Sequence, residues 1–195
     1  MTRNKPVEIQ RKTTETNINL SLRLEGSRTI TVDTGIGFFD HMLATLAFWA
    51  GWDLNLTCRG DLQVDTHHTV EDVALTIGQA LREAMEGSKE IERFGSVFVP
   101  MDEALSQVVV DLSGRPYCVF EATFPAERAG SFETAMTDHF FRSLAFEARA
   151  TLHIRSIYGQ DAHHMIESMF KGLGLALRQA LIPRPGGVPS TKGVQ

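Results

Sequence analysis

The chain contains two copies of a pattern in which two adjacent histidines are followed, three residues after the second, by a glutamate. The copies consist of His67, His68 and Glu71, and of His163, His164 and Glu167. Imidazole nitrogens and carboxylate oxygens are common ligands of transition metal ions. One such pattern is unremarkable, but two copies in one chain predict a metal site with internal symmetry.

The similarity between the two copies extends beyond the pattern itself. Asp40-His41 matches Asp138-His139 upstream, and Gly78 matches Gly174 downstream. Six of the seven histidines therefore occupy matched positions. Only His153 has no counterpart, and we interpret it as a structural residue. The simplest interpretation is a duplicated fold that binds two metal ions.

The spacing within each copy constrains which ligands can share an ion. Glu71 lies four residues beyond His67, so the two side chains fall on one face of a helix. Adjacent helical residues diverge by ~100°, so His67 and His68 are expected to serve different sites. If the symmetry holds, each site receives three histidines and one glutamate. This donor set suits Mn, Fe, Co or Zn better than Mg or Ca.

Composition disfavours several classes of protein. The 195 residues can form a core that needs neither disulfides nor a metal. Cys58 and Cys118 lie far apart and outside any CxxC spacing, which argues against a secreted disulfide scaffold and a cysteine-ligated zinc site. A net charge of −5 argues against a nucleic-acid partner. Without a signal-peptide pattern or a run of ~20 apolar residues, we expect a cytoplasmic protein with no membrane partner.

Apolar periodicity predicts strands and helices that alternate in two similar halves. The strands expected are 7–9, 17–24, 29–32 and 53–59, then 96–102, 104–112, 117–123 and 151–158. The helices expected are 35–50, 69–85, 132–149 and 164–181. The predicted fold class is α+β, with two duplicated halves, each a sheet covered on one face by helices, packed as one unit. We expect the halves to be residues 1–91 and 92–182, followed by a flexible tail, 183–195.

Nine segments of the chain resemble the imidazoleglycerol-phosphate dehydratase family. They are GIGFFDHML (35–43), GDLQVDTHHTVED (60–72), RFG (93–95), PMDEAL (100–105), DLSGRPY (111–117), DHFFRSLA (138–145), HHMIESMFK (163–171), ALRQA (176–180) and PSTKG (189–193). The paired histidines and the PSTKG segment are specific to that family. The resemblance implies a metal-dependent dehydration of imidazole glycerol phosphate to imidazole acetol phosphate, a step of histidine biosynthesis.

The resemblance also implies an architecture and a cofactor. The fold would contain left-handed β-α-β crossovers, and 24 subunits would assemble with active sites between them. Each active site would hold two Mn²⁺ ions, with Fe, Co or Zn as alternatives. The implied ligands are the eight residues that the repeat singles out: His41, His67, His68, Glu71, His139, His163, His164 and Glu167.

The implied reaction explains why metal ions would be needed. Two Lewis-acidic ions at the imidazole ring would stabilise an imidazolate, from which hydroxide leaves to give a diazafulvene. A base then takes a proton from the neighbouring carbon, and the resulting enol becomes the ketone. The resemblance assigns this base to Glu15 and gives Asp102 a weaker acid–base or positioning role.

The substrate phosphate should meet cationic and hydroxyl groups, because charge-assisted hydrogen bonds both stabilise and orient it. The positions that match the family are Arg93, Arg115, Lys171, Ser190 and Lys192. Lys192 would give the tail a reason to close over the substrate.

Five positions depart from the family pattern, namely Ala44, Thr45, Trp49, Thr66 and Ala162. None is a metal or phosphate position. They bear on the orientation of the ligands and on the substrate hydroxyl contacts near Trp49.

Two other functions would also use clustered histidines and glutamates. A dinuclear metallohydrolase acting on a phosphate ester would draw more heavily on aspartate ligands than this chain does. A metal-storing or structural assembly would keep the ligands without turnover, and would tolerate replacement of Glu15, Arg93 or Lys192.

Overall fold

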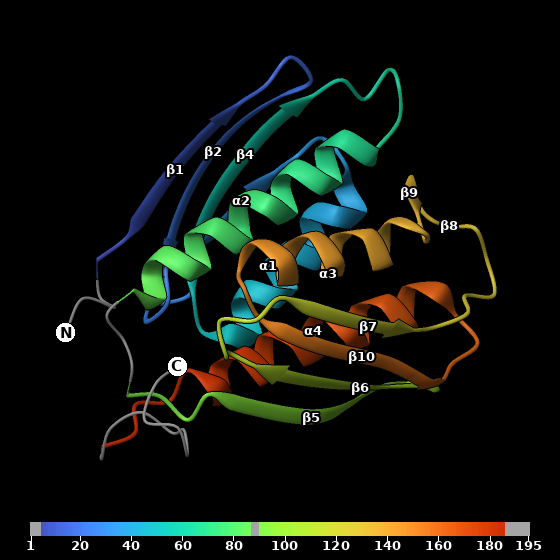
Figure 1. Cartoon of the computed structure of the whole chain (residues 1–195). Helices are drawn as coiled ribbons and strands as arrows, with labels where there is room; N and C mark the ends of the chain where they lie inside the picture. The colour runs from blue at the N-terminus through green and yellow to red at the C-terminus, as the bar shows by residue number, and fades with distance from the viewer. Residues whose placement is uncertain (1–4, 87–89, 186–195) are drawn as a thin grey trace.

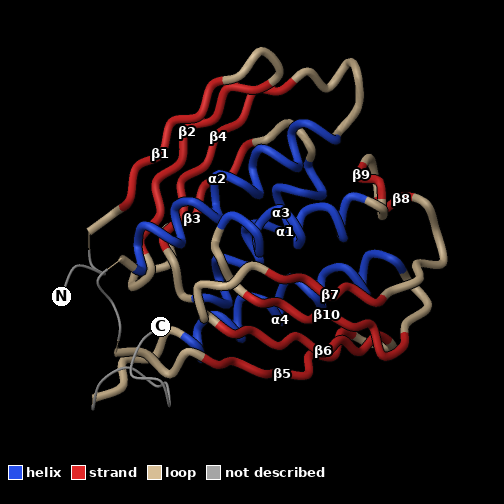
Figure 2. Tube along the Cα trace, viewed as in Figure 1, coloured by secondary structure: helices blue, strands red, loops and turns tan. Residues whose placement is uncertain are grey.

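The computed structural model describes residues 5–86 and 90–185, which form two four-stranded sheets with four helices between them (Figure 1). The tube view shows the same layers, with the strands outside and the helices inside (Figure 2). The predicted α+β class, the two similar halves and the helical cover on one face of each sheet are confirmed.

The first sheet has the strand order β1-β2-β4-β3. Its strands are β1 (Val7–Lys12), β2 (Thr16–Arg23), β3 (Ile30–Asp33) and β4 (Asp53–Gly60). Only β3 and β4 pair in parallel, and helix α1 (Gly37–Ala50) connects them. Helix α2 (His67–Met85) follows β4 and packs on β1, β2 and β4.

The second sheet repeats this arrangement in the order β5-β6-β10-β7. Its strands are β5 (Phe94–Met101), β6 (Ala104–Asp111), β7 (Tyr117–Glu121) and β10 (Thr151–Tyr158). Helix α3 (Met136–Glu147) connects the parallel pair β7 and β10, and helix α4 (Ala162–Ala180) follows β10. The two predicted crossovers are thus present, and their left hand stays a prediction.

Alternating side chains direct each sheet toward the helices. In β2, Ile18, Leu20 and Leu22 are buried, while the residues between them are exposed or half-buried. In β6, Val108 and Val110 follow the same alternation. Because successive side chains of a strand point to opposite faces, each sheet presents one apolar face, and the helices bury it.

The helices of one half pack on the helices of the other. Helix α1 packs on α4, and α2 packs on α3. At Gly174, an added Cβ would lie 2.5 Å from the Leu46 carbonyl oxygen and 3.0 Å from the Ala50 nitrogen. At Gly78, the matched distances are 2.9 Å to the Leu144 oxygen and 3.0 Å to the Ala148 nitrogen. The backbones therefore touch at both crossings, which join the halves into one unit.

The prediction that a helix begins at residue 132 is wrong. Phe132–Glu133 forms strand β9, which pairs with β8 (Arg128–Ala129), and α3 begins only at Met136. Phe132 is fully buried and stacks on Phe39 of α1, with ring centroids 5.8 Å apart. A tertiary contact with the other half therefore fixes this segment, which local periodicity cannot show.

Two findings bear on the expectations from composition. Cys58 and Cys118 are free and buried, and burial raises the pKa of each thiol to about 11. Within the described part of the chain, no helix combines the length and the apolar character needed to cross a membrane.

We predict that Gly174→Ala destabilises the fold by about 1–3 kcal/mol, because the new methyl group meets helix backbone that cannot rotate away. Gly37→Ala is the matched control, since its Cβ would meet nothing within 4 Å. That variant should be neutral or slightly stabilised. Denaturant unfolding measures both, and equal midpoints for the two variants would contradict the role of the crossing.

Candidate metal centre

One group of candidate ligands lies where the N-terminal halves of α1 and α4 meet. Glu167 Oε2 is 3.2 Å from His41 Nε2 and 3.0 Å from His163 Nε2. One ligand atom from each residue lies within 4.8 Å of the other two. Glu167 is buried, whereas the two imidazoles are partly exposed. The arrangement gives two nitrogens and one oxygen around a common point.

A second group repeats this arrangement where α2 meets α3. Glu71 lies 3.9 Å from His67 Nε2 through Oε2 and 3.6 Å from His139 Nε2 through Oε1. These three ligand atoms also lie within 4.8 Å of one another. His139 Nε2 is buried and has no hydrogen-bond partner among the described residues. A buried ring nitrogen without a partner is costly unless something else binds it, so this donor set fits a metal ion.

Local hydrogen bonds fix the turns that carry these ligands. Asp161 accepts hydrogen bonds from the backbone nitrogens of His163 and His164 and so caps α4. Asp65 accepts one from the His67 nitrogen at the start of α2. Asp40, next to His41, accepts hydrogen bonds from the backbone and hydroxyl of Thr34. Hydrogen bonds that need no metal ion therefore hold the turns at His41, His67 and the His163–His164 pair.

A lysine adjoins the first group. Lys171 Nζ lies 2.9 Å from Glu167 Oε1, one helical turn further along α4. Burial raises the pKa of Glu167, but Lys171, His41 and His163 more than offset this effect and hold the pKa below its ordinary value. Glu167 is therefore an ionised carboxylate at neutral pH, as a metal ligand must be.

The second histidine of each pair points away from these groups, as expected for adjacent helical residues. The rings of His67 and His68 are inclined by 75°, and those of His163 and His164 by 79°. His68 lies 3.0 Å from Asp61 and 3.6 Å from Glu15. The side chains of each pair thus diverge, and their binding to different metal ions stays a prediction. Each candidate group within one chain contains two histidines, where three per site were expected.

His164 has a matching environment at the other hairpin. Its Nδ1 lies 2.7 Å from Glu103 Oε2, and its Nε2 lies 3.8 Å from Asp102. The hydrogen bond to Glu103 raises the pKa of His164, just as Asp61 raises the pKa of His68. In turn, His164 and two backbone amides lower the pKa of Glu103 to about 2.

Sequence reasoning missed Asp61 and Glu103. Glu103 directly precedes β6, just as Glu15 directly precedes β2. Glu103 and Glu15 therefore occupy matched positions in matched hairpins. Residues 13–15 join β1 to β2, whereas residues 102–103 join β5 to β6. The turn that carries Glu103 is therefore one residue shorter than the turn that carries Glu15. The match between Glu103 and Glu15 depends on the strand pairing, so the histidine repeat in the sequence does not reveal it.

The phosphate candidates within the described residues, Arg93, Arg115 and Lys171, do not converge in one chain. Arg93 contacts Asp111 through two hydrogen bonds of 2.6 and 3.1 Å, and Arg115 lies 3.9 Å from the same carboxylate. This cluster lies at the end of β6 far from the turn that carries Asp102. Of these three described candidates, Lys171 alone adjoins a metal group. Ser190 and Lys192 lie outside the described residues.

Three of the five departures from the family pattern gather at one hollow. Ala44, Thr45 and Trp49 line a cavity of about 440 Å³ that also reaches Glu167 and Lys171. Thr66 is the residue before α2, and Ala162 is the buried first residue of α4. His153 is exposed on β10 and belongs to neither ligand group, and its structural role stays a prediction.

Comparisons with known proteins agree with this geometry. A family model described as imidazoleglycerol-phosphate dehydratase matches residues 34–177. The dehydratase of Acetivibrio thermocellus is 50% identical over 189 residues, covering 96% of this chain and 97% of the relative. That of Solidesulfovibrio magneticus is 55% identical over 185 residues, covering 94% of each chain.

Solved structures show the same likeness. The crystal structure of imidazoleglycerol-phosphate dehydratase from Staphylococcus aureus is similar with a TM-score of 0.84 and 39% identity, covering 91% of this chain and 99% of that one. The Pyrococcus furiosus protein, solved in complex with (S)-C348, gives a TM-score of 0.84 and 38% identity, covering 96% of this chain and 100% of that one.

We predict that His139→Ala lowers bound metal and weakens metal affinity by more than the ~10–100-fold typical of losing an outer-shell partner. His153→Ala is the matched control, because it removes a histidine outside both groups. Elemental analysis after dialysis against limiting Mn²⁺ measures the metal retained. Equal metal content in the two variants would refute the second ligand group.

A second prediction concerns protonation. Glu103→Gln replaces the charged acceptor that raises the pKa of His164 with a neutral amide, so that pKa should fall toward its ordinary value of 6.5. Histidine NMR titration of the metal-free protein measures the change, and His68 serves as the internal control. The His164–Glu103 pair stabilises the fold fully between pH 4.5 and 6.5, the ordinary pKa values of its two groups. This stability is lost as pH rises through the raised pKa of His164, and also as pH falls toward the Glu103 pKa of about 2. An unchanged His164 titration would rule out this coupling.

Proposed function

This chain belongs to the imidazoleglycerol-phosphate dehydratase family, and we propose that its two histidine–glutamate groups hold metal ions that act in the dehydration. As a member of that family it is a hydro-lyase of histidine biosynthesis. The proposed reaction converts imidazole glycerol phosphate to imidazole acetol phosphate. The observation that carries the metal proposal is the repeated convergence of two histidines and one glutamate within 4.8 Å.

We propose two Mn²⁺ ions per active site, with Fe, Co or Zn as alternatives, because imidazole and carboxylate donors in a partly open site suit such ions. His41, His163 and Glu167 would hold one ion, and His67, Glu71 and His139 the other. His68 and His164 would supply the remaining ligands. When bound, the ions would supply Lewis acidity that favours the imidazolate form of the substrate ring.

We propose that active sites form between subunits of a homo-oligomer, for which 24 subunits is the expected size. Three observations support this arrangement. His68 and His164 point away from the ligand groups of their own chain, Glu15 lies on a hairpin turn, and Arg93 lies at the far end of its sheet. We also propose that residues 1–91 and 92–182 are the two repeats, and that the protein acts in the cytoplasm.

Glu15 is the proposed base. Its carboxylate is partly exposed and lies 3.6 Å from His68 Nε2, so a base and a ligand would face the same substrate. As the substrate hydroxyl leaves, Glu15 would accept the proton from the neighbouring carbon, and the enol would become the ketone. Asp102, exposed and 3.8 Å from His164, would position the substrate at the matched hairpin.

Cations are proposed to hold the phosphate. Lys171 would bring a positive charge to the metal side, because it already adjoins Glu167. Arg115 is largely exposed and offers donors that Asp111 does not use. Arg93 is oriented by Asp111 and would contribute a donor from a fixed guanidinium. Ser190 and Lys192 complete the proposed set.

The direct test incubates the Mn-loaded protein with imidazole glycerol phosphate and assays the ketone product. The wild-type protein should turn over, and Glu15→Gln should lower kcat by ~10²–10⁴-fold with unchanged metal content. Glu8→Gln, which alters another carboxylate of the first sheet, is the control and should retain activity. Metal-loaded wild-type protein that forms no product would sink the proposal. Full activity in Glu15→Gln would remove Glu15 as the base and leave the metal groups.

A further inference from the structure

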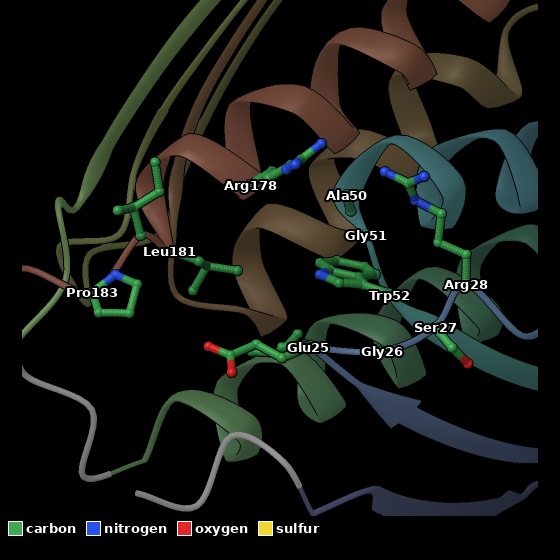
Figure 3. Close-up of a pocket in the computed structure, with 12 residues that line it drawn as sticks. Glu25, Gly26, Ser27, Arg28, Ala50, Gly51, Trp52, Arg178, Leu181 and Pro183 are labelled. Carbon is green, nitrogen blue, oxygen red and sulfur yellow. The ribbon is translucent and has the colours of Figure 1, made fainter.

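A cavity of about 510 Å³ lies beside the C-terminal ends of α1 and α4 (Figure 3). The loop of residues 24–28, which joins β2 to β3, closes another side. None of the metal or catalytic candidates lines it. Its volume falls within the range of ~300–1,000 Å³ that is usual for small-molecule sites.

Two arginines face this cavity. Arg28 and Arg178 both line it, and neither forms an ion pair within residues 5–86 and 90–185. Figure 3 shows their guanidinium groups on the same side of the cavity, near Ala50, with the Glu25 carboxylate on the opposite side. The Arg28 guanidinium lies 4.8 Å from the centre of the Phe48 ring. In a chain of net charge −5, two unpaired arginines at one cavity form a local positive site.

The counterpart of Arg178 in the first half of the chain has an ion-pair partner. Arg82 matches Arg178 in the register that matches His67 with His163. Arg82 pairs with Glu147 at 2.5 Å, beside a smaller matched cavity of about 290 Å³. The residue that matches Glu147, in the register of His41 and His139, is Trp49. Arg178 therefore lacks a carboxylate because a tryptophan stands where the other half has glutamate.

The remaining walls suit an apolar body. Trp52, Leu181 and Pro183 line the cavity, and Trp52 is only 1% exposed. Trp52 Nε1 has no hydrogen-bond partner in the described structure. In Figure 3 its nitrogen edge points toward the side where Leu181 and Pro183 lie. A buried donor without an acceptor is unusual, and a ligand acceptor would satisfy it.

We infer that this cavity binds a small organic phosphate or phosphonate, with the anionic head at Arg28 and Arg178 and the apolar body against Trp52 and Leu181. Guanidinium groups bind such oxyanions through paired, charge-assisted hydrogen bonds, and two of them match a doubly charged head. The ligand would draw Arg28 away from Phe48 and supply Arg178 with the anion that Glu147 supplies to Arg82.

The test titrates phenylphosphonate into the assembled, Mn-loaded protein by calorimetry, with benzyl alcohol as the neutral analogue. Arg178→Gln should weaken phenylphosphonate binding at this site by at least 10-fold. Trp49→Glu should weaken it similarly, because it restores the carboxylate that the other half has. Arg82→Gln is the matched control and should bind as the wild type does.

Binding at the proposed substrate site would be common to wild type and Arg178→Gln, so only the difference between them reports on this cavity. The inference is overturned if Arg178→Gln titrates as the wild type, or if benzyl alcohol binds as tightly as phenylphosphonate. Both outcomes are measured by binding and not by turnover. A failure of this inference is therefore distinguishable from a failure of the dehydratase proposal.

Discussion

The close contact between helix backbones at Gly78 and Gly174 is the constraint on which the rest of the structure depends. Each glycine lets a helix of one half approach the carbonyl and amide groups of a helix from the other half. The crossing of α1 with α4 places His41 beside Glu167, and the crossing of α2 with α3 places His139 beside Glu71. A larger side chain at either glycine would separate helices that each contribute ligands to one group. The same close helix packing therefore sets the ligand geometry in both groups.

Much of this architecture could be predicted from periodicity and repetition. Helices α1, α2 and α4 and strand β10 were expected within a few residues of their observed bounds, because each has a strong apolar pattern. Strand β9 could not be, because Phe132 is held by Phe39 of the other half. The sequence also indicated that adjacent histidines diverge. It could not show that Asp61 and Glu103 hold them, because those contacts depend on how the loop after β4 and the turn between β5 and β6 fold over the helix starts.

Carboxylates beside the histidines explain how a strongly polar site is tolerated next to a core. Every one of the six matched histidines has a carboxylate oxygen within 4 Å. Two of these carboxylates, Asp61 and Glu103, lie outside the ligand groups and raise the pKa of His68 and His164. Such partners fix the ring orientation, and a carboxylate beside a ligating imidazole also makes it more basic. Protons and metal ions therefore compete for the same nitrogens, and metal uptake becomes stronger as pH rises.

Duplication also makes the differences between the halves informative. The residues that are the same in the matched helices include the metal-ligand candidates. The residues that differ give each half its own cavities and contacts. Trp49 is the clearest case, since it lines the hollow that reaches Glu167 and leaves Arg178 without the carboxylate that Arg82 has. Arg28 lines both that hollow and the cavity beside Arg178, and its guanidinium lies over the ring of Phe48, which also lines the hollow. One departure from symmetry thus shapes a wall of the candidate active site and frees a positive charge in the neighbouring cavity. An anion that moves Arg28 would change both cavities, because a single side chain forms part of each.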